Sequence, residues 1–464
     1  MQLPESPLAL SGRILQLAFP LIFINVGIMI MQFIDALFLA WYSPEAIAAV
    51  VPAGMASFLL VSACIGTAGY TGTFVAHYMG SGQQEQMHHA LWQGIYVALA
   101  SSVIVAAIGF FARPLMSLAG HAPAVIELEA QFFEIMCWGS VFGIVSSALS
   151  GYYSGQSRTR ILMATQLCGI AINIVLDYVL IFGHWGFPRM GIRGAAIATI
   201  AGQLATCLLL CVVYIIGIDK TVVLKRIVAF NQSMMLRLLK FGLPSGIRFA
   251  FEMLAWTLFL FIVGRIGTQE QAASNIVFRI NGFAFFPIIG IAQAVAIMVG
   301  QAQGSRDSRL SFRITVTGMV LAESWMVLAA IAFFVVPNVL LNMFTGNSDV
   351  ATSMVMTHIG VVLLRFVAIY CLLDAFNIVM VSVLQAAGDT RFTMIVSIVA
   401  HGVLLSALFI VDHFHGGLYV EWLIATVFVV VTALIWLWRF SRGAWRTMEV
   451  VEAQVFEGEP AAAP

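Results

Sequence analysis

The chain has 464 residues, of which 61% are hydrophobic and 9% are charged, and its formal net charge is zero. Soluble domains usually carry roughly 25% charged residues, so this chain has too few charges to cover the surface of a water-soluble protein. The neutral balance gives no reason to expect a nucleic acid as partner. The composition therefore indicates an integral membrane protein.

Twelve long apolar runs follow one another along the chain, and each is long enough to cross a hydrocarbon core, which takes ~20 residues. The runs are unbroken and lack the alternation of strands in an outer-membrane barrel, so we predict helices. All six cysteines lie inside these runs, which favours packing residues over disulfides. The predicted helices cover residues 14–41, 46–79, 89–112, 127–152, 161–183, 194–217, 238–264, 271–303, 311–336, 354–386, 392–412 and 417–440.

The positions of the Lys and Arg residues predict the orientation of the chain. Fifteen of them, from Arg13 to Arg446, fall in the two termini and the even-numbered loops, and four fall in the odd-numbered loops. Positive residues favour the cytoplasmic side of a membrane. We therefore expect a multi-pass protein of the cell (inner) membrane with both termini in the cytoplasm.

A constant offset of residue number aligns the first half of the chain with the second. At an offset of 224, the matched pairs include Pro20 with Pro244, Gly66 with Gly290, and Gly80 with Gly304. Further on the offset becomes 231, and Thr159-Arg160 matches Thr390-Arg391. Each half would hold six helices, an even number that returns the chain to its starting side, so the halves share one orientation.

The duplication predicts an all-α polytopic membrane protein with twelve transmembrane helices in two pseudo-symmetric six-helix lobes. Two parallel lobes that face each other enclose a central cavity, which is typical of transporters. The alternative is that the duplication records ancestry only. The predicted organisation is an N-lobe (1–218), a cytoplasmic linker (219–240), a C-lobe (241–448) and a disordered C-terminal tail (449–464).

Polar side chains of three N-lobe helices are predicted at one depth of the membrane. Asp35 and Asp177 lie in its outer half at ~1.5 Å per residue, and Thr199 lies at a similar depth. Asn173 is four residues before Asp177 and shares its helix face. An ionised side chain deep in a membrane helix costs roughly 2.5–3.5 kcal/mol, so such carboxylates are functional candidates.

The two carboxylates suggest proton exchange. Close together in low dielectric they resist double ionisation, so the pair tends to hold one proton. We predict Asp35 as the proton carrier, with Asp177 sharing the proton. The spacing of Asn25, Gln32 and Asp35 gives the first helix a polar stripe that we expect to face inward. The predicted hydrogen-bond partners of the pair are Asn173, Thr199, Gln32 and Asn25.

Pro20 is the predicted hinge of the first helix, because proline removes a backbone donor and crowds the carbonyl one turn earlier. Our hypothesis is that protonation of Asp35 breaks its hydrogen bonds, the helix bends, and the N-lobe cavity shrinks to expel substrate. The alternative is that the polar cluster is fully hydrogen-bonded and has only a structural role.

Charged residues also fall within the predicted C-lobe helices. They are Arg248, Glu252, Arg279, Glu323, Arg365 and Asp374. A buried ion-pair network is favoured because arginines and carboxylates nearly match in number. A cation site formed by Glu252, Asp374, Arg248 and Arg365 is the other interpretation.

No motif in the sequence indicates catalysis or a cofactor. There is no phosphate-binding GxxxxGK[ST] loop, HExxH or GxSxG. The loop histidines His88-His89 and His413/His415 are expected to be ordinary surface residues rather than metal ligands. We therefore predict no enzyme, no metal and no cofactor, with an ion gradient as the source of energy.

Three parts of the chain resemble motifs of the multidrug and toxic compound extrusion (MATE) family. They are Leu176–Gly183 continued by Gly186–Pro188 and Gly191–Thr199, the loop Ala387–Arg391, and Val299–Gly304. The resemblance implies a V-shaped pair of six-helix lobes that exports cationic or amphipathic compounds in exchange for protons or sodium.

The resemblance also bears on the coupling ion. The N-lobe cluster is similar to that of the DinF-like, proton-coupled members, although Gln131-Phe132-Phe133 stands where some relatives carry a tyrosine. Glu252 and Asp374 resemble positions used by the sodium-coupled NorM-like branch.

We therefore predict a monomeric multidrug antiporter that exchanges small cationic or amphipathic molecules for protons by alternating access. The alternatives are a sodium-coupled MATE exporter that uses the C-lobe site, and a flippase of lipid-linked oligosaccharides from the same superfamily. A flippase would be expected to have a more basic central cavity.

Overall fold

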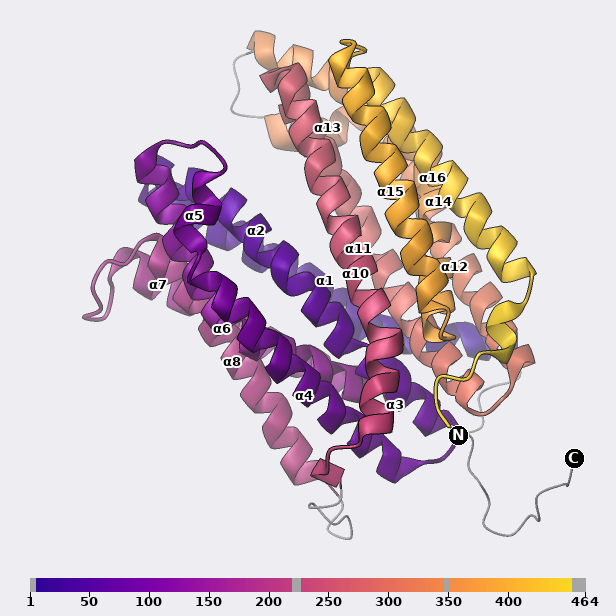
Figure 1. Cartoon of the computed structure of the whole chain (residues 1–464). Helices are drawn as coiled ribbons and strands as arrows, with labels where there is room; N and C mark the ends of the chain where they lie inside the picture. The colour runs from indigo at the N-terminus through magenta and orange to yellow at the C-terminus, as the bar shows by residue number, and fades with distance from the viewer. Residues whose placement is uncertain (1–5, 219–226, 346–349, 453–464) are drawn as a thin grey trace, which may run out of the picture.

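The computed structural model describes residues 6–218, 227–345 and 350–452, and its regular elements are helices (Figure 1). The first half contains α1 (Pro7–Tyr42), α2 (Pro44–Gly69), α3 (Thr71–Gly80), α4 (Gln84–Gly109), α5 (Ala112–Ser117), α6 (Pro123–Gly155), α7 (Thr159–Phe182) and α8 (Ile192–Gly217). The second half contains α10 (Gln232–Ile266), α11 (Thr268–Gly304), α12 (Ser308–Val335), α13 (Pro337–Thr345), α14 (Val350–Ala386), α15 (Thr390–His413), α16 (Leu418–Ser441) and the 3₁₀ turn η1 (Ala444–Thr447).

Twelve helices within the described residues are long and apolar enough to cross a membrane, which confirms the predicted number. The helices α2 and α3 form one of these spans, Pro44–Gly80, interrupted only at Tyr70. Several spans are longer than the apolar runs. The reason is visible at α1, where the Ser6 Oγ accepts a hydrogen bond of 3.2 Å from the Ala9 amide and Pro7 opens the first turn.

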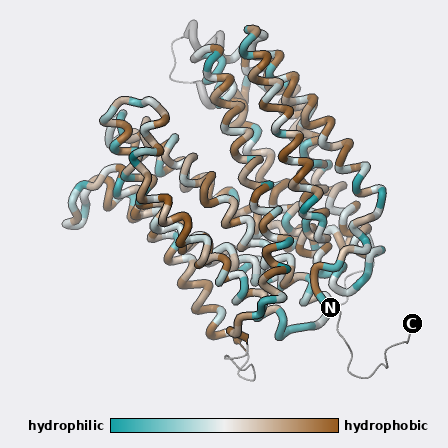
Figure 2. The backbone as a smooth tube through the Cα atoms, in the orientation of Figure 1, coloured by the Kyte–Doolittle hydropathy of each residue, from teal (hydrophilic) through white to brown (hydrophobic). Residues whose placement is uncertain are grey.

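The outside of the helix bundle is apolar. Hydrophobic segments run along most of the length of the helices, and hydrophilic segments gather towards their ends (Figure 2). Large side chains such as Val103, Ile216 and Leu328 are exposed in mid-helix or near a helix end. In a bilayer these side chains meet lipid instead of water, as expected of a multi-pass membrane protein.

The two halves pack their helices in the same way. In the N-lobe, α1 packs on α7 and α2 on α6; in the C-lobe, α10 packs on α15 and α11 on α14. The lobes meet where α1 and α3 pack on α11 and α2 packs on α10, and they diverge towards the opposite end (Figure 1). We call the end with the α3–α11 contact the closed end. The V-shaped pair of six-helix lobes is thus confirmed, while their residue boundaries stay a prediction.

The predicted linker and tail are described in part. Lys220, Lys225 and Arg226 lie outside the described residues, as does the tail from residue 453 onward. The stretch before it packs on the closed end, because Val450 is fully buried and the Glu452 carboxylate lies 3.0 Å from Arg237 Nη1. Packed structure therefore continues past Met448, where the tail was predicted to begin.

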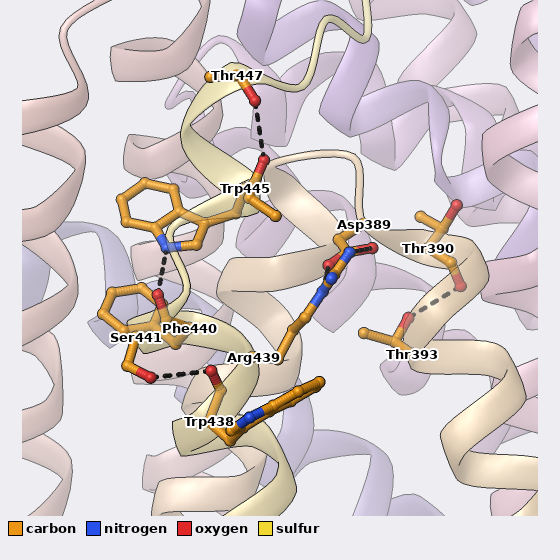
Figure 3. Close-up of polar contacts among 10 residues, drawn as sticks. Asp389, Thr390, Thr393, Trp438, Arg439, Phe440, Ser441, Trp445 and Thr447 are labelled. Atoms are coloured by element: carbon orange, nitrogen blue, oxygen red, sulfur yellow. Dashed lines mark hydrogen bonds and ion pairs between the residues drawn. The ribbon is translucent and has the colours of Figure 1, made fainter.

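The loop Ala387–Arg391 connects α14 to α15, and an ion pair ties it to α16 (Figure 3). The carboxylate of Asp389 accepts hydrogen bonds of 2.6 Å and 3.2 Å from Nε and Nη2 of Arg439 on α16, and its side chain is only 4% exposed. The same guanidinium lies 4.4 Å above the ring of Phe392. Asp389 thus fastens the start of α15 to the end of α16 and has a structural role.

Asp389→Ala should destabilise the protein by about 3 kcal/mol, because the half-buried Arg439 guanidinium then loses its carboxylate. The measurement is the thermal unfolding midpoint of detergent-purified protein. The control is Arg442→Ala, which removes an exposed cation–π contact of 4.2 Å with Trp438 and should cost about 1 kcal/mol or less. Equal losses in the two variants would contradict the assignment.

Candidate functional site

The structure brings the two N-lobe carboxyl groups together. Asp35 on α1 and Asp177 on α7 interact directly through their side chains. Asp177 is fully buried and Asn173 is 1% exposed. The Asn173 side chain also lies close to Asp177, but neither Asp177 oxygen has a hydrogen-bond partner of good geometry among the described residues. A proton between the two carboxyls would supply the donor that the surrounding side chains do not.

Close helix crossing holds Asn173 at this position. A Cβ added at Gly202 on α8 would lie 2.8 Å from the Gly169 carbonyl oxygen and 2.9 Å from the Asn173 Cβ. A Cβ at Gly169 on α7 would overlap the Thr206 hydroxyl. Glycine at both positions lets α7 and α8 pack backbone to backbone, which fixes the face of α7 that carries Asn173 and Asp177.

The other predicted partners are placed differently. The Thr199 hydroxyl donates to the Ala195 carbonyl of its own helix at 2.9 Å. Gln32 is exposed, and no hydrogen bond joins it to the carboxyl pair within the described chain. Asn25 is about 15 Å along α1 from Asp35 at ~1.5 Å per residue, and it lines a separate cavity. Pro20 is buried within a continuous α1, so its role as a hinge stays a prediction.

A cavity of about 330 Å³ lies between the lobes. It is lined by α1, the end of α2, α3, α6 and α7 of the N-lobe and by α11 of the C-lobe. No charged residue is among the described residues that line it. Its polar groups are amides and hydroxyls, from Asn25, Thr73, Ser150, Ser154, Gln166 and Gln293.

Of the six charged residues predicted within the C-lobe helices, two form a close ion pair, and the six do not form a network. Arg248 Nη1 lies 2.6 Å from Glu252 Oε2 on the next turn of α10. Asp374 on α14 is near enough to Glu252 for their charges to interact. The prediction that Arg365 belongs to this group is wrong. Arg365 is exposed, and its guanidinium lies 5.8 Å above the Phe334 ring. Arg279 is exposed as well, because a long arginine side chain can reach away from the helix packing.

Among the buried titratable residues that were missed from the sequence are Glu129, Glu421 and His401. Glu129 on α6 is fully buried, and its Oε1 lies 2.7 Å from Nδ1 of His121. Glu421 on α16 is also fully buried. His401 on α15 is 7% exposed and lies within electrostatic range of the Arg248–Glu252 pair. An acidic residue in an apolar helix is the signal for the two glutamates, but both lie near helix starts, where the sequence also fits an exposed position.

Comparisons with known proteins agree with this architecture. The sequence model of the MatE family matches residues 20–179 and 244–409, two segments that begin at the equivalent prolines Pro20 and Pro244. A relative from Rhizobium meliloti described as "Probable multidrug resistance protein NorM" is 26% identical over 417 residues, which cover 88% of each chain.

Two solved structures share the fold. One is described as the outward-facing conformation of a multidrug resistance MATE family transporter of the MOP superfamily. It has a TM-score of 0.81 at 18% identity, covering 97% of this chain and 100% of that chain. The other is a MOP superfamily transporter from Pyrococcus furiosus, with a TM-score of 0.82 at 19% identity and the same coverage.

Twelve apolar helices in two similar lobes around a cavity define a polytopic membrane transporter. The chain belongs to the MatE family, whose members are membrane transporters and not enzymes.

Gly202→Ala should weaken both stability and transport, because the added methyl group pushes α7 and Asn173 away from α8. Such overpacking costs typically about 1–3 kcal/mol. The control is Gly217→Ala on the same helix, where a Cβ meets nothing within 4 Å. The unfolding midpoint and the export rate of a fluorescent cation are measured for both variants. Wild-type behaviour of Gly202→Ala would show that the helix crossing does not position the pair.

Proposed function

We propose that the protein is a proton-coupled antiporter in which Asp35 carries the proton and Asp177 shares it. The observation that supports this most is the carboxyl pair, in which Asp177 is fully buried and Asp35 is half-buried, and the Asp177 oxygens have no hydrogen-bond partner among the described residues. One proton stabilises such a pair, and loss of that proton leaves two like charges in contact. The ionisation state of the pair can thus drive a change of helix packing.

The hinge at Pro20 would carry this change to the cavity. The proline nitrogen cannot donate to the carbonyl of Gln16, so α1 lacks one of its hydrogen bonds there. Leu21, next to the proline, lines the interlobe cavity, while Asp35 lies farther along the same helix. A bend at Pro20 would therefore move the cavity wall together with the carboxyl pair.

Sodium coupling through the C-lobe is the second candidate, because the curated relative is described as a NorM protein. The geometry favours the proton. Glu252 is already neutralised by Arg248 at 2.6 Å, and a guanidinium in contact competes with a bound cation. The flippase alternative gains no support, since no lysine or arginine lines the interlobe cavity in the described chain.

The substrates that we propose are small amphipathic or cationic molecules. The cavity combines aliphatic side chains with uncharged amides, which suits varied ligands held by shape and a few hydrogen bonds. The proposed setting is a monomer in the inner membrane with the closed end and both termini in the cytoplasm, as the Lys and Arg distribution predicts. The lobes would then open outward.

Asp35→Asn should abolish substrate-driven proton movement, because an amide cannot release a proton. Purified protein is reconstituted in vesicles with an imposed pH gradient, and ethidium is added with or without sodium while the internal pH is followed. Wild-type protein should release protons in both media, and Glu252→Gln should retain this flux. Proton flux that persists in Asp35→Asn and is lost in Glu252→Gln would reverse the assignment of lobes.

Pro20→Ala should slow transport severalfold without lowering the unfolding midpoint, because the new amide donates to the Gln16 carbonyl and stiffens α1. The control is Pro244→Ala, the equivalent change in α10. It should leave the export rate near the wild-type value. Equal slowing by both changes would indicate a general effect of helix stiffness and contradict a hinge in α1 alone.

A further inference from the structure

At the closed end, equivalent residues of the two lobes contact each other reciprocally. A Cβ added to Gly80 would overlap the carbonyl oxygen of Gln301, and a Cβ added to Gly304 would overlap the carbonyl oxygen of His77. Both Gly80 with Gly304 and His77 with Gln301 are pairs at the offset of 224. The backbones of α3 and α11 therefore cross at matching positions of the duplication, and glycine is what allows them to approach.

The side chains at this crossing bind the opposite lobe. The His77 Nε2 lies 2.8 Å from the carbonyl oxygen of Ala386 on α14, so this nitrogen carries the hydrogen and donates. The Gln301 Nε2 donates to the carbonyl oxygen of Gly155 on α6, also at 2.8 Å. Ala386 and Gly155 differ by 231, the second offset of the duplication. The two hydrogen bonds are thus symmetry mates across the lobe interface.

Both acceptors are at helix ends, since α6 ends at Gly155 and α14 ends at Ala386. Carbonyls in the last turn of a helix have no donor within the helix and need one from elsewhere. The donors are buried, with His77 only 2% and Gln301 5% exposed. If the lobes separate here, water must replace the lost partners, so each bond can form only when the interface is closed.

The crossing separates two hollow spaces. On one side lies the interlobe cavity, whose lining includes Ala76 next to His77 and Ser154 next to Gly155. On the other side, His77, Gly80 and Gly304 line a second hollow of about 710 Å³ at the closed end, together with residues from Arg446 to Glu452. Ala76 lines the first hollow and its chain neighbour His77 lines the second, so the α3–α11 crossing lies between them.

We propose that His77 and Gln301 are positioning residues of transport that hold this crossing shut through their paired bonds to the opposite lobe. In the alternate state both bonds are broken and the interlobe cavity joins the hollow at the closed end. This inference rests on the alternating-access function proposed above. It is independent of whether the coupling ion is a proton or sodium.

The test measures access to the cavity from each side of the membrane. A single cysteine is placed at Ser150, which lines the cavity, in protein whose six native cysteines are replaced. A membrane-impermeant maleimide is applied to vesicles of both orientations, without substrate or gradient. Because no transport is required, failure of the proton-coupling proposal would not affect this readout.

His77→Leu/Gln301→Leu should raise labelling from the closed-end side by at least ~10-fold, because both cross-lobe bonds are lost. His77→Gln should label like the wild type, since glutamine is the residue that the C-lobe uses for the same bond. The matched control is Gln303→Leu, whose Nε2 has no hydrogen-bond partner among the described residues. It should not change the rates.

Unchanged labelling in the folded double variant would overturn the proposal, as would closed-end labelling of His77→Gln as high as that of the double variant. If the double variant does not fold, Gln301→Leu and Gln301→His decide in its place. Leucine should raise closed-end labelling and histidine should not. Equal rates for these two variants would contradict the proposal.

Discussion

Inside a hydrocarbon core there is no water to satisfy a backbone amide, so the chain must satisfy its own amides within its helices. Once this is done, the lobes can be joined only by side chains and by close approach of helix backbones. The structure uses glycine for that approach, as at Gly66, where an added Cβ would lie 2.7 Å from the Cα of Gly246 in the other lobe. A polar side chain placed in this setting must find a partner inside the protein, and the side chains of Asn173 and Asp177 are among the exceptions.

The two copies of the duplication carry their charged side chains at different positions of the shared scaffold. Asp35 of the N-lobe corresponds to Phe259 of the C-lobe, which is fully buried against Trp256, Phe278 and Trp422. In the other direction, Glu252 corresponds to the apolar Ile28. The scaffold is shared, but one copy holds two carboxyl groups in contact and the other holds an arginine against a glutamate. In the mechanism that we propose, the first arrangement responds to a single proton, whereas in the second Arg248 already balances the charge of Glu252.

The architecture could be predicted because membrane crossing imposes a minimum length and a composition on each helix. The meeting of Asp35, Asp177 and Asn173 also followed from the sequence, since depth along a helix and a four-residue spacing are local quantities. The placement of Asn25 and Gln32 away from the carboxyl pair could not be predicted in this way. The neighbours of α1 change along its length, so one polar stripe passes from a cavity wall to an exposed face to the buried pair. Helical spacing contains no information on that change.

Other features depended on contacts that no local pattern records. Matching the number of arginines to that of carboxylates suggested a network, whereas Arg365 lies over an aromatic ring at the edge of the lobe. The cross-lobe bonds of His77 and Gln301 required the ends of α6 and α14 to be placed beside them. The offsets of 224 and 231 contained both pairs, but an alignment of halves does not say which residues touch.

The interruption at Tyr70 has no counterpart in the other half of the duplication. In the N-lobe the span Pro44–Gly80 is divided into α2 and α3, and the Tyr70 hydroxyl donates to the Gln385 carbonyl oxygen of the C-lobe at 2.7 Å. The corresponding C-lobe helix α11 runs through 37 residues without a break. The two walls of the cavity therefore differ: one is divided at Tyr70, and the other is a continuous helix that contains Pro287. The two copies need not bend at equivalent positions, so a movement need not be shared equally between the lobes.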